Sequence, residues 1–99
     1  MKYINKIELC GVVGRISEMD GLYTFSLMTE GSYKCKDSVV TDVTWFNCKA
    51  CDLPGLGEIN RGSKVHLFGR FENYKYLGKD GEERSFYTVI VTDFKIIYE

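Results

Sequence analysis

The chain has 99 residues, of which 44% are hydrophobic and 27% charged, and its formal net charge is −1. This length suits one domain spanning residues 1–99, and no apolar run is long enough to cross a bilayer, so we expect no membrane partner. The near-zero charge excludes indiscriminate attraction of polyanions, so any nucleic-acid site must be local. No secretory signal is visible at the N-terminus, and the expected location is cytoplasmic.

Strands separated by glycine turns are expected along most of the chain, which is rich in β-branched and aromatic residues. The first strand is expected over residues 3–16, with Gly11 and Gly14 marking a bend or bulge. Asp20-Gly21 is a strong turn signal, and clean alternation predicts a second strand from residue 22 to about residue 29. The polar segment over residues 30–40 predicts a mobile loop.

The third strand, expected over residues 41–51, contains the only tryptophan. Side chains alternate between the two faces of a strand. This run therefore has one core-like face and one surface-like face: Phe46, Cys48 and Ala50 on the first, and Trp45, Asn47, Lys49 and Cys51 on the second.

Trp45 is the most informative residue of that surface-like face. A large aromatic side chain beside an amide and an ammonium is suited to stacking a planar base and holding an anionic backbone, as single-stranded nucleic acid requires. The alternative is that Trp45 fills an outer hydrophobic cluster or a subunit contact.

The second half of the chain predicts two more strands. Residues 52–62 can support at most one short helical turn. A fourth strand is expected over residues 64–76, a turn over residues 77–81 and a fifth strand over residues 84–98. This order matches a small all-β, five-stranded Greek-key barrel.

The fifth strand is apolar on both faces, which is more than the inside of a small barrel needs. Phe68, Phe86 and Ile90 are therefore the candidates for a homo-oligomer interface, most simply a two-fold one. The alternative is a local cluster covered by a loop of the same chain.

No catalytic site is expected, because the sequence lacks a nucleophile elbow, a phosphate loop and paired metal-ligand histidines. Its one histidine, His66, has no serine or cysteine partner identifiable from spacing. Cys48 and Cys51 have C-x-x-C spacing, but positions three apart on a strand face opposite ways, and no second ligand pair completes a tetrahedral set. We expect free thiols with no metal and no cofactor. A thiol- or metal-linked regulator stays open as an alternative.

Short motifs follow one another along the chain: Asn5-Lys6-Ile7-Glu8-Leu9-Cys10-Gly11 with Gly14, Phe25-Ser26-Leu27-Met28-Thr29, Thr44-Trp45, Arg61-Gly62-Ser63-Lys64-Val65 with Gly69-Arg70, and Asp80-Gly81. In their order and spacing they resemble the bacterial single-stranded DNA-binding proteins over nearly the full length. The resemblance implies an OB-fold, a five-stranded Greek-key barrel. The family's long helix after the third strand is cut down here to the Pro54-Gly55 segment, so at most a short helical turn is expected between strands three and four. The resemblance also implies a role in DNA replication, recombination or repair.

The resemblance carries over to individual positions. Tyr33, Trp45 and Tyr76 match the family's stacking aromatics, whereas a fourth such position falls on Cys51, whose thiol cannot stack a base. Glu72 stands at one of the family's basic positions. The acidic-tipped tail that recruits replication and repair enzymes in the family is missing, so no tail-mediated recruitment is expected.

We therefore predict sequence-nonspecific single-stranded DNA binding by a homo-oligomer, either a dimer or a dimer-of-dimers tetramer. The candidate binding residues combine stacking aromatics with cations near the backbone path: Tyr33, Lys34, Lys36, Trp45, Lys49, Arg70, Tyr74, Lys75, Tyr76 and Arg84. Two alternatives stay open, a tailless accessory barrel resembling primosomal replication protein N, and an oligomeric protein-interaction module without DNA binding.

Overall fold

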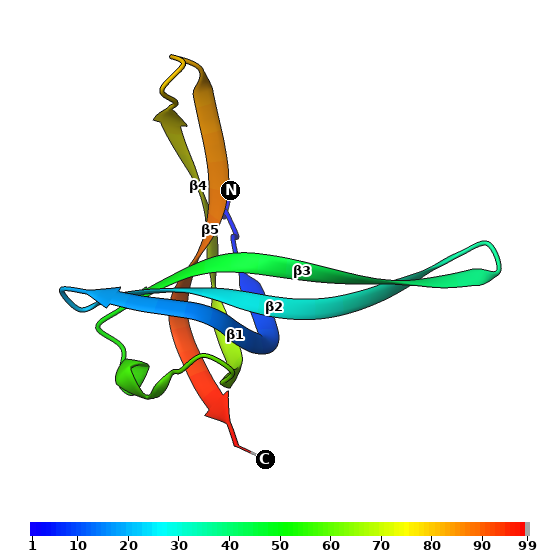
Figure 1. Ribbon diagram of the computed structural model, residues 1–99, viewed down its shortest axis with the longest axis horizontal. Helices are drawn as coiled ribbons and strands as arrows, with labels where there is room; N and C mark the ends of the chain where they lie inside the picture. Colours follow the sequence, from blue (N-terminus) through cyan, green and yellow to red (C-terminus); the bar gives the residue numbers. More distant parts are fainter. Residues whose placement is uncertain (99) are drawn as a thin grey trace.

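Five strands form a closed barrel in the computed structural model, which describes residues 1–98 (Figure 1). The elements in chain order are β1 (Ile7–Met19), β2 (Leu22–Cys35), β3 (Ser38–Cys51), the 3-10 turn η1 (Leu56–Glu58), β4 (Lys64–Leu77) and β5 (Glu83–Ile97). Around the barrel the strands follow the order β1-β2-β3-β5-β4. The predicted fold class is therefore confirmed, including the short helical turn between the third and fourth strands.

β1 bends so that it contributes to two sides of the barrel. Its first half pairs with β4, from the Ile7–Gly69 rung to the Val12–Lys64 rung, and its second half pairs with β2. The register with β2 shifts between Val13 and Ile16, which confirms the bulge predicted near Gly14. The strand begins four residues later than expected and continues to Met19.

The prediction of a loop over residues 30–40 is wrong. β2 continues to Cys35, β3 begins at Ser38, and the two strands pair without interruption out to the Cys35–Ser38 rung. Lys36 has a φ of 56°, as the two-residue turn at Lys36-Asp37 requires. Residues 30–39 are all exposed. Both faces of this hairpin segment meet solvent, so its sequence lacks the apolar alternation of a half-buried strand.

Two hairpin arms therefore leave the barrel in different directions, one built from β2 and β3 and the other from β4 and β5 (Figure 1). Between the arms, β3 and β5 pair in parallel over two rungs, Cys48–Val89 and Lys49–Ile90. Beyond these rungs the two strands separate, so the bases of the arms flank an open junction.

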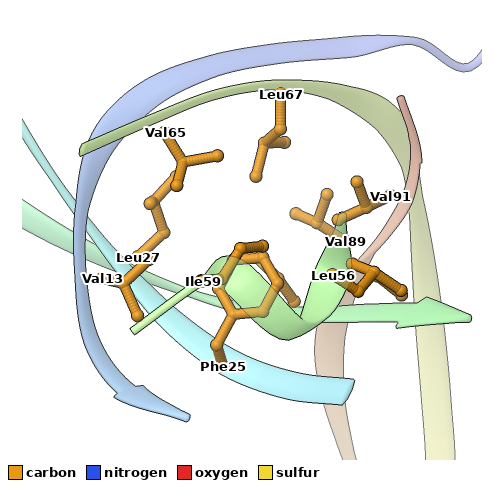
Figure 2. Packing of buried hydrophobic residues seen from close by; sticks show 11 residues of the cluster. Val13, Phe25, Leu27, Leu56, Ile59, Val65, Leu67, Val89 and Val91 are labelled. Carbon is orange, nitrogen blue, oxygen red and sulfur yellow. The ribbon is translucent and has the colours of Figure 1, made fainter. Parts of the chain in front are cut away.

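The core lies inside the barrel and consists mainly of aliphatic side chains from all five strands (Figure 2). Leu27, Val65 and Leu67 are completely buried. Leu56 of η1 and the adjacent Ile59 are buried with them, so the segment between β3 and β4 contributes to the same cluster. Within residues 1–98, η1 is the one helical segment, and no helix there could span a bilayer.

We predict that Gly69→Ala lowers the free energy of unfolding by about 1–3 kcal/mol, measured by urea denaturation. Gly69 lies where the β4–β5 register shifts, and an added Cβ would overlap the backbone carbonyl oxygen of Ile90. Gly31→Ala is the matched control, because nothing lies within 4 Å of a Cβ at that position. Equal stability losses in the two variants would contradict this account of the barrel.

Candidate functional site

Trp45 lies at the junction between the two arms. Its side chain is 56% exposed and projects from β3 just before the Cys48–Val89 rung. Part of the indole ring rests against Gly14 of β1, because a Cβ built on Gly14 would lie 2.5 Å from Cζ3 and 2.8 Å from Cη2 of the ring. Gly14 thus leaves the space in which the tryptophan sits. The predicted faces of β3 are confirmed, since Cys48 and Ala50 are buried whereas Trp45 and Asn47 are exposed.

An open cleft of about 960 Å³ lies beside Trp45. Its lining comes from β1, β2, β3 and β5, together with Arg61 from the segment before β4. Lys49 and Arg15 contribute positive charge to this lining, and Phe86 contributes an aromatic ring. The cleft therefore combines a π-surface with cations, which is the combination that a nucleotide chain requires.

An aromatic surface continues from the cleft along the β4–β5 arm. The rings of Tyr74 and Phe86 stack with centroids 5.6 Å apart and an interplanar angle of 24°. Tyr76 meets Phe86 edge-on at 5.9 Å, and Lys49 Nζ lies 4.2 Å from the centroid of the Tyr74 ring. Phe86 and Tyr76 are 43% and 50% exposed. The structure thus brings Trp45, Lys49, Tyr74 and Tyr76 of the predicted set together through Phe86.

Phe86 was expected at a subunit interface with Phe68 and Ile90, and the structure places it in the cleft lining beside Tyr74 and Tyr76. In the β4–β5 register Phe86 pairs with Tyr74, six residues along β4 from Phe68, a separation of about 20 Å. Phe68 is 41% exposed near the opposite end of β4, with its ring 4.9 Å from that of His66. Ile90 is half-buried between them. The three side chains share a sheet face without forming one compact cluster.

Tyr33, Lys34 and Lys36 lie on the outer part of the β2–β3 arm. Tyr33 is exposed, and it lies five residues beyond the Met28–Trp45 rung, about 17 Å along β2. Lys36 is in the turn at the tip of the arm. These residues are not gathered at the cleft, and a ligand would have to run along the arm to contact them.

Three of the predicted cations form ion pairs: Arg70 with Glu72 at 2.7 Å, Lys75 with Glu83 at 3.8 Å, and Arg84 with Asp80 at 2.8 Å. The hydrogen bond from Arg70 is the largest cause that lowers the pKa of Glu72 from its usual value. Hydrogen bonding by the backbone of Glu82, followed by Arg84, lowers the pKa of Asp80. Exposed ion pairs are weak, so these cations stay available to a phosphate at reduced effective charge.

The predicted binding set omits several residues of the cleft lining: Arg15, Asn47, Arg61, Phe86 and Thr88. Asn47 had a signal, because it shares the face of Trp45. Arg15 follows the bulge of β1, and nothing in the sequence alone places it near β3. Among residues 1–98, neither Arg15 nor Arg61 forms an ion pair with a carboxylate. They add positive charge to the cleft that the predicted set lacks.

Cys48 and Cys51 face opposite sides of β3, as their spacing predicts. Cys48 is buried and Cys51 exposed, and burial raises the pKa of the Cys48 thiol to about 12. The described part of the chain contains no group of three or more histidine, cysteine or carboxylate side chains arranged to hold a metal ion. These two cysteines therefore do not form a joint site in this structure.

Sequence comparison relates the chain to single-stranded DNA-binding proteins of Neisseria meningitidis serogroups A and B. Each is 29% identical to it over 105 aligned positions, which include 95% of this chain and 60% of the relative. The chain thus spans about three fifths of the length of these curated relatives. No family model matches the chain. The similarity predicted from the short motifs is confirmed by these relatives.

Solved structures share the fold. The structure described as a Plasmodium falciparum SSB complex with ssDNA has a TM-score of 0.84 and 20% identity, covering 99% of this chain and 98% of that one. A deletion mutant of the single-stranded DNA-binding protein from Thermus aquaticus has a TM-score of 0.77 and 14% identity, covering 96% of this chain and 51% of that one. The barrel is therefore the OB-fold of these proteins.

We predict that Gly14→Ala displaces the indole of Trp45 while the barrel stays folded. The new methyl group would occupy the space of the ring edge, so quenching of tryptophan fluorescence by acrylamide should increase. Since Trp45 is the only tryptophan, the signal is unambiguous. Gly31→Ala serves as the control, and far-ultraviolet circular dichroism checks the fold. Unchanged quenching would show that Gly14 does not hold the ring.

Proposed function

We propose that this OB-fold chain, similar over nearly its whole length to single-stranded DNA-binding proteins, binds single-stranded DNA by base stacking and phosphate contacts. The observation that carries the proposal is the exposed indole of Trp45 beside an open cleft that contains Lys49, Arg15 and Arg61. The name of the Plasmodium structure, a complex with single-stranded DNA, supports the same ligand class. The activity is binding rather than catalysis.

Aromatic stacking is the main source of affinity in this proposal. Each base stacked on an aromatic side chain contributes about 1–3 kcal/mol, and every base has a face to stack. One base would stack on Trp45, and the next would follow the surface formed by Phe86, Tyr74 and Tyr76. Bases in a duplex already stack on each other, so such a surface selects single strands.

Charge contributes less than the number of lysines and arginines suggests. Each phosphate that a cation neutralises steepens the salt dependence of binding. Because Arg70, Lys75 and Arg84 already pair with carboxylates, the cations of the cleft and those on the β2–β3 arm carry most of this contribution. We therefore expect binding with a shallow salt dependence, as well as weaker stacking where Cys51 replaces an aromatic residue.

The biological setting follows from the ligand. Single strands are exposed during DNA replication, recombination and repair, and we propose that the chain acts in these processes in the cytoplasm. Protein contacts of the kind made by an accessory barrel, or by an interaction module that has lost DNA binding, are the alternative. The ion pairs that reduce the effective charge of half of the predicted cations favour that alternative.

We predict that oligo-dT quenches the fluorescence of Trp45 and that added salt weakens this quenching only gradually. Affinity for fluorescein-labelled oligo-dT, followed by anisotropy, should fall about 5- to 150-fold in Trp45→Leu, corresponding to the loss of one stacked base. Trp45→Phe keeps a π-face and should retain most of the affinity. Met19→Ala is the control, because Met19 is an exposed apolar residue at the end of β1 that does not line the cleft. Micromolar oligo-dT that changes neither emission nor anisotropy would exclude the proposed function.

We further propose a homo-oligomer, a dimer or a dimer-based tetramer, with Phe68 in its interface and Phe86 in the DNA-binding surface. Phe68→Glu should lower the mass measured by light scattering and leave quenching of Trp45 by oligo-dT intact. Phe86→Glu should leave the mass unchanged and weaken the quenching of Trp45 by oligo-dT, because the Phe86 ring stacks on Tyr74 beside the cleft. The same mass for Phe68→Glu and the unmodified chain would contradict this interface.

A further inference from the structure

Thr88 has an unpaired hydroxyl group in the lining of the cleft. Its side chain is 2% exposed, and Oγ1 has no hydrogen-bond partner within residues 1–98. Glu72 lies opposite Thr88 in the β4–β5 register, but its carboxylate is bonded to Arg70 at 2.7 Å. Buried polar groups without a partner are rare, because they lose their hydration without compensation. The Thr88 hydroxyl can therefore form a hydrogen bond with a ligand in the cleft.

Asn47 provides a second polar group at the same place. Asn47 and Thr88 each precede the paired Cys48–Val89 rung by one residue, so their side chains leave neighbouring strands on the same face. Both line the cleft. The Asn47 amide also forms no side-chain hydrogen bond within the described chain. Together the amide and the hydroxyl offer both donors and acceptors without any charge.

Both groups lie close to Trp45. Trp45 and Asn47 are two residues apart on one face of β3, a spacing of about 7 Å. A base that stacks on the indole would extend over this distance and bring one of its edges to Asn47 and Thr88. A phosphate is a poorer match, because neither side chain is cationic. The sugar-phosphate backbone of the DNA would also stay in solvent, whereas the Thr88 hydroxyl is buried.

We propose that Asn47 and Thr88 form a base-edge site that hydrogen-bonds the nucleobase stacked on Trp45. The inference rests on the proposed function and deepens it: binding is tolerant of sequence along most of the strand but discriminates between bases at this one position. Asparagine is well suited to this role, because its amide can donate to and accept from the same base edge.

Oligo-dT and oligo-dC of equal length test the proposal, because thymine and cytosine have the same ring size but different donor and acceptor patterns. The affinity ratio of the two, measured by anisotropy of labelled oligonucleotides, should differ from one by about three- to tenfold in the unmodified chain. Thr88→Val removes the hydroxyl at nearly constant shape and should bring the ratio close to one, as should Asn47→Ala. Urea denaturation checks that each variant is folded.

Thr24→Val is the matched control. Thr24 also lines the cleft, but its hydroxyl already bonds Ser17 Oγ at 2.8 Å, so the ratio should stay unchanged. A ratio near one in the unmodified chain, or a ratio that Thr88→Val leaves unaltered, overturns the base-edge site while quenching of Trp45 by both oligonucleotides still supports DNA binding. Loss of quenching by both oligonucleotides instead contradicts the proposed function itself.

Discussion

Two rungs of parallel pairing between β3 and β5 close the barrel, and most other features depend on them. Cys48 and Val89, which form one of these rungs, are each 1% exposed, so the contact belongs to the core. Immediately beyond it the strands separate, and Trp45, Asn47 and Thr88 lie at this separation. Closing the barrel through such a short contact thus leaves the neighbouring strand segments apart, and the cleft occupies the space between them.

Charge is distributed unevenly over this small, nearly neutral chain. The β4–β5 arm presents cations that are held by nearby carboxylates, whereas Arg15 and Arg61 line the cleft without such partners among residues 1–98. Exposed ion pairs contribute little to stability, so their main effect is on the local potential. Cations without carboxylate partners among residues 1–98 are therefore concentrated in the cleft beside Trp45 rather than on the aromatic surface of the β4–β5 arm.

The sequence predicted the strand count, the barrel and the two faces of β3, because alternation at a period of two is a local signal. It did not predict the β2–β3 arm. Both faces of this strand pair meet solvent, so the segment lacks the apolar alternation that identifies a strand and resembles a polar loop. The contact between Phe86 and Tyr74 was also not predicted, because it depends on the register between β4 and β5. Thr88 comes to the cleft through the pairing of β3 with β5, two strands distant in sequence, for which no local pattern exists.

The outer part of the β2–β3 arm is held almost entirely by backbone hydrogen bonds between two strands that solvent surrounds. Such a segment opens at a lower free energy than the barrel, because few apolar contacts are lost when it opens. Its amides should therefore exchange with solvent by local unfolding while the core stays protected. A strand of DNA lying along the arm would oppose that opening, and part of its binding free energy would be used to order the arm. An arm that is already more rigid would therefore bind DNA more tightly.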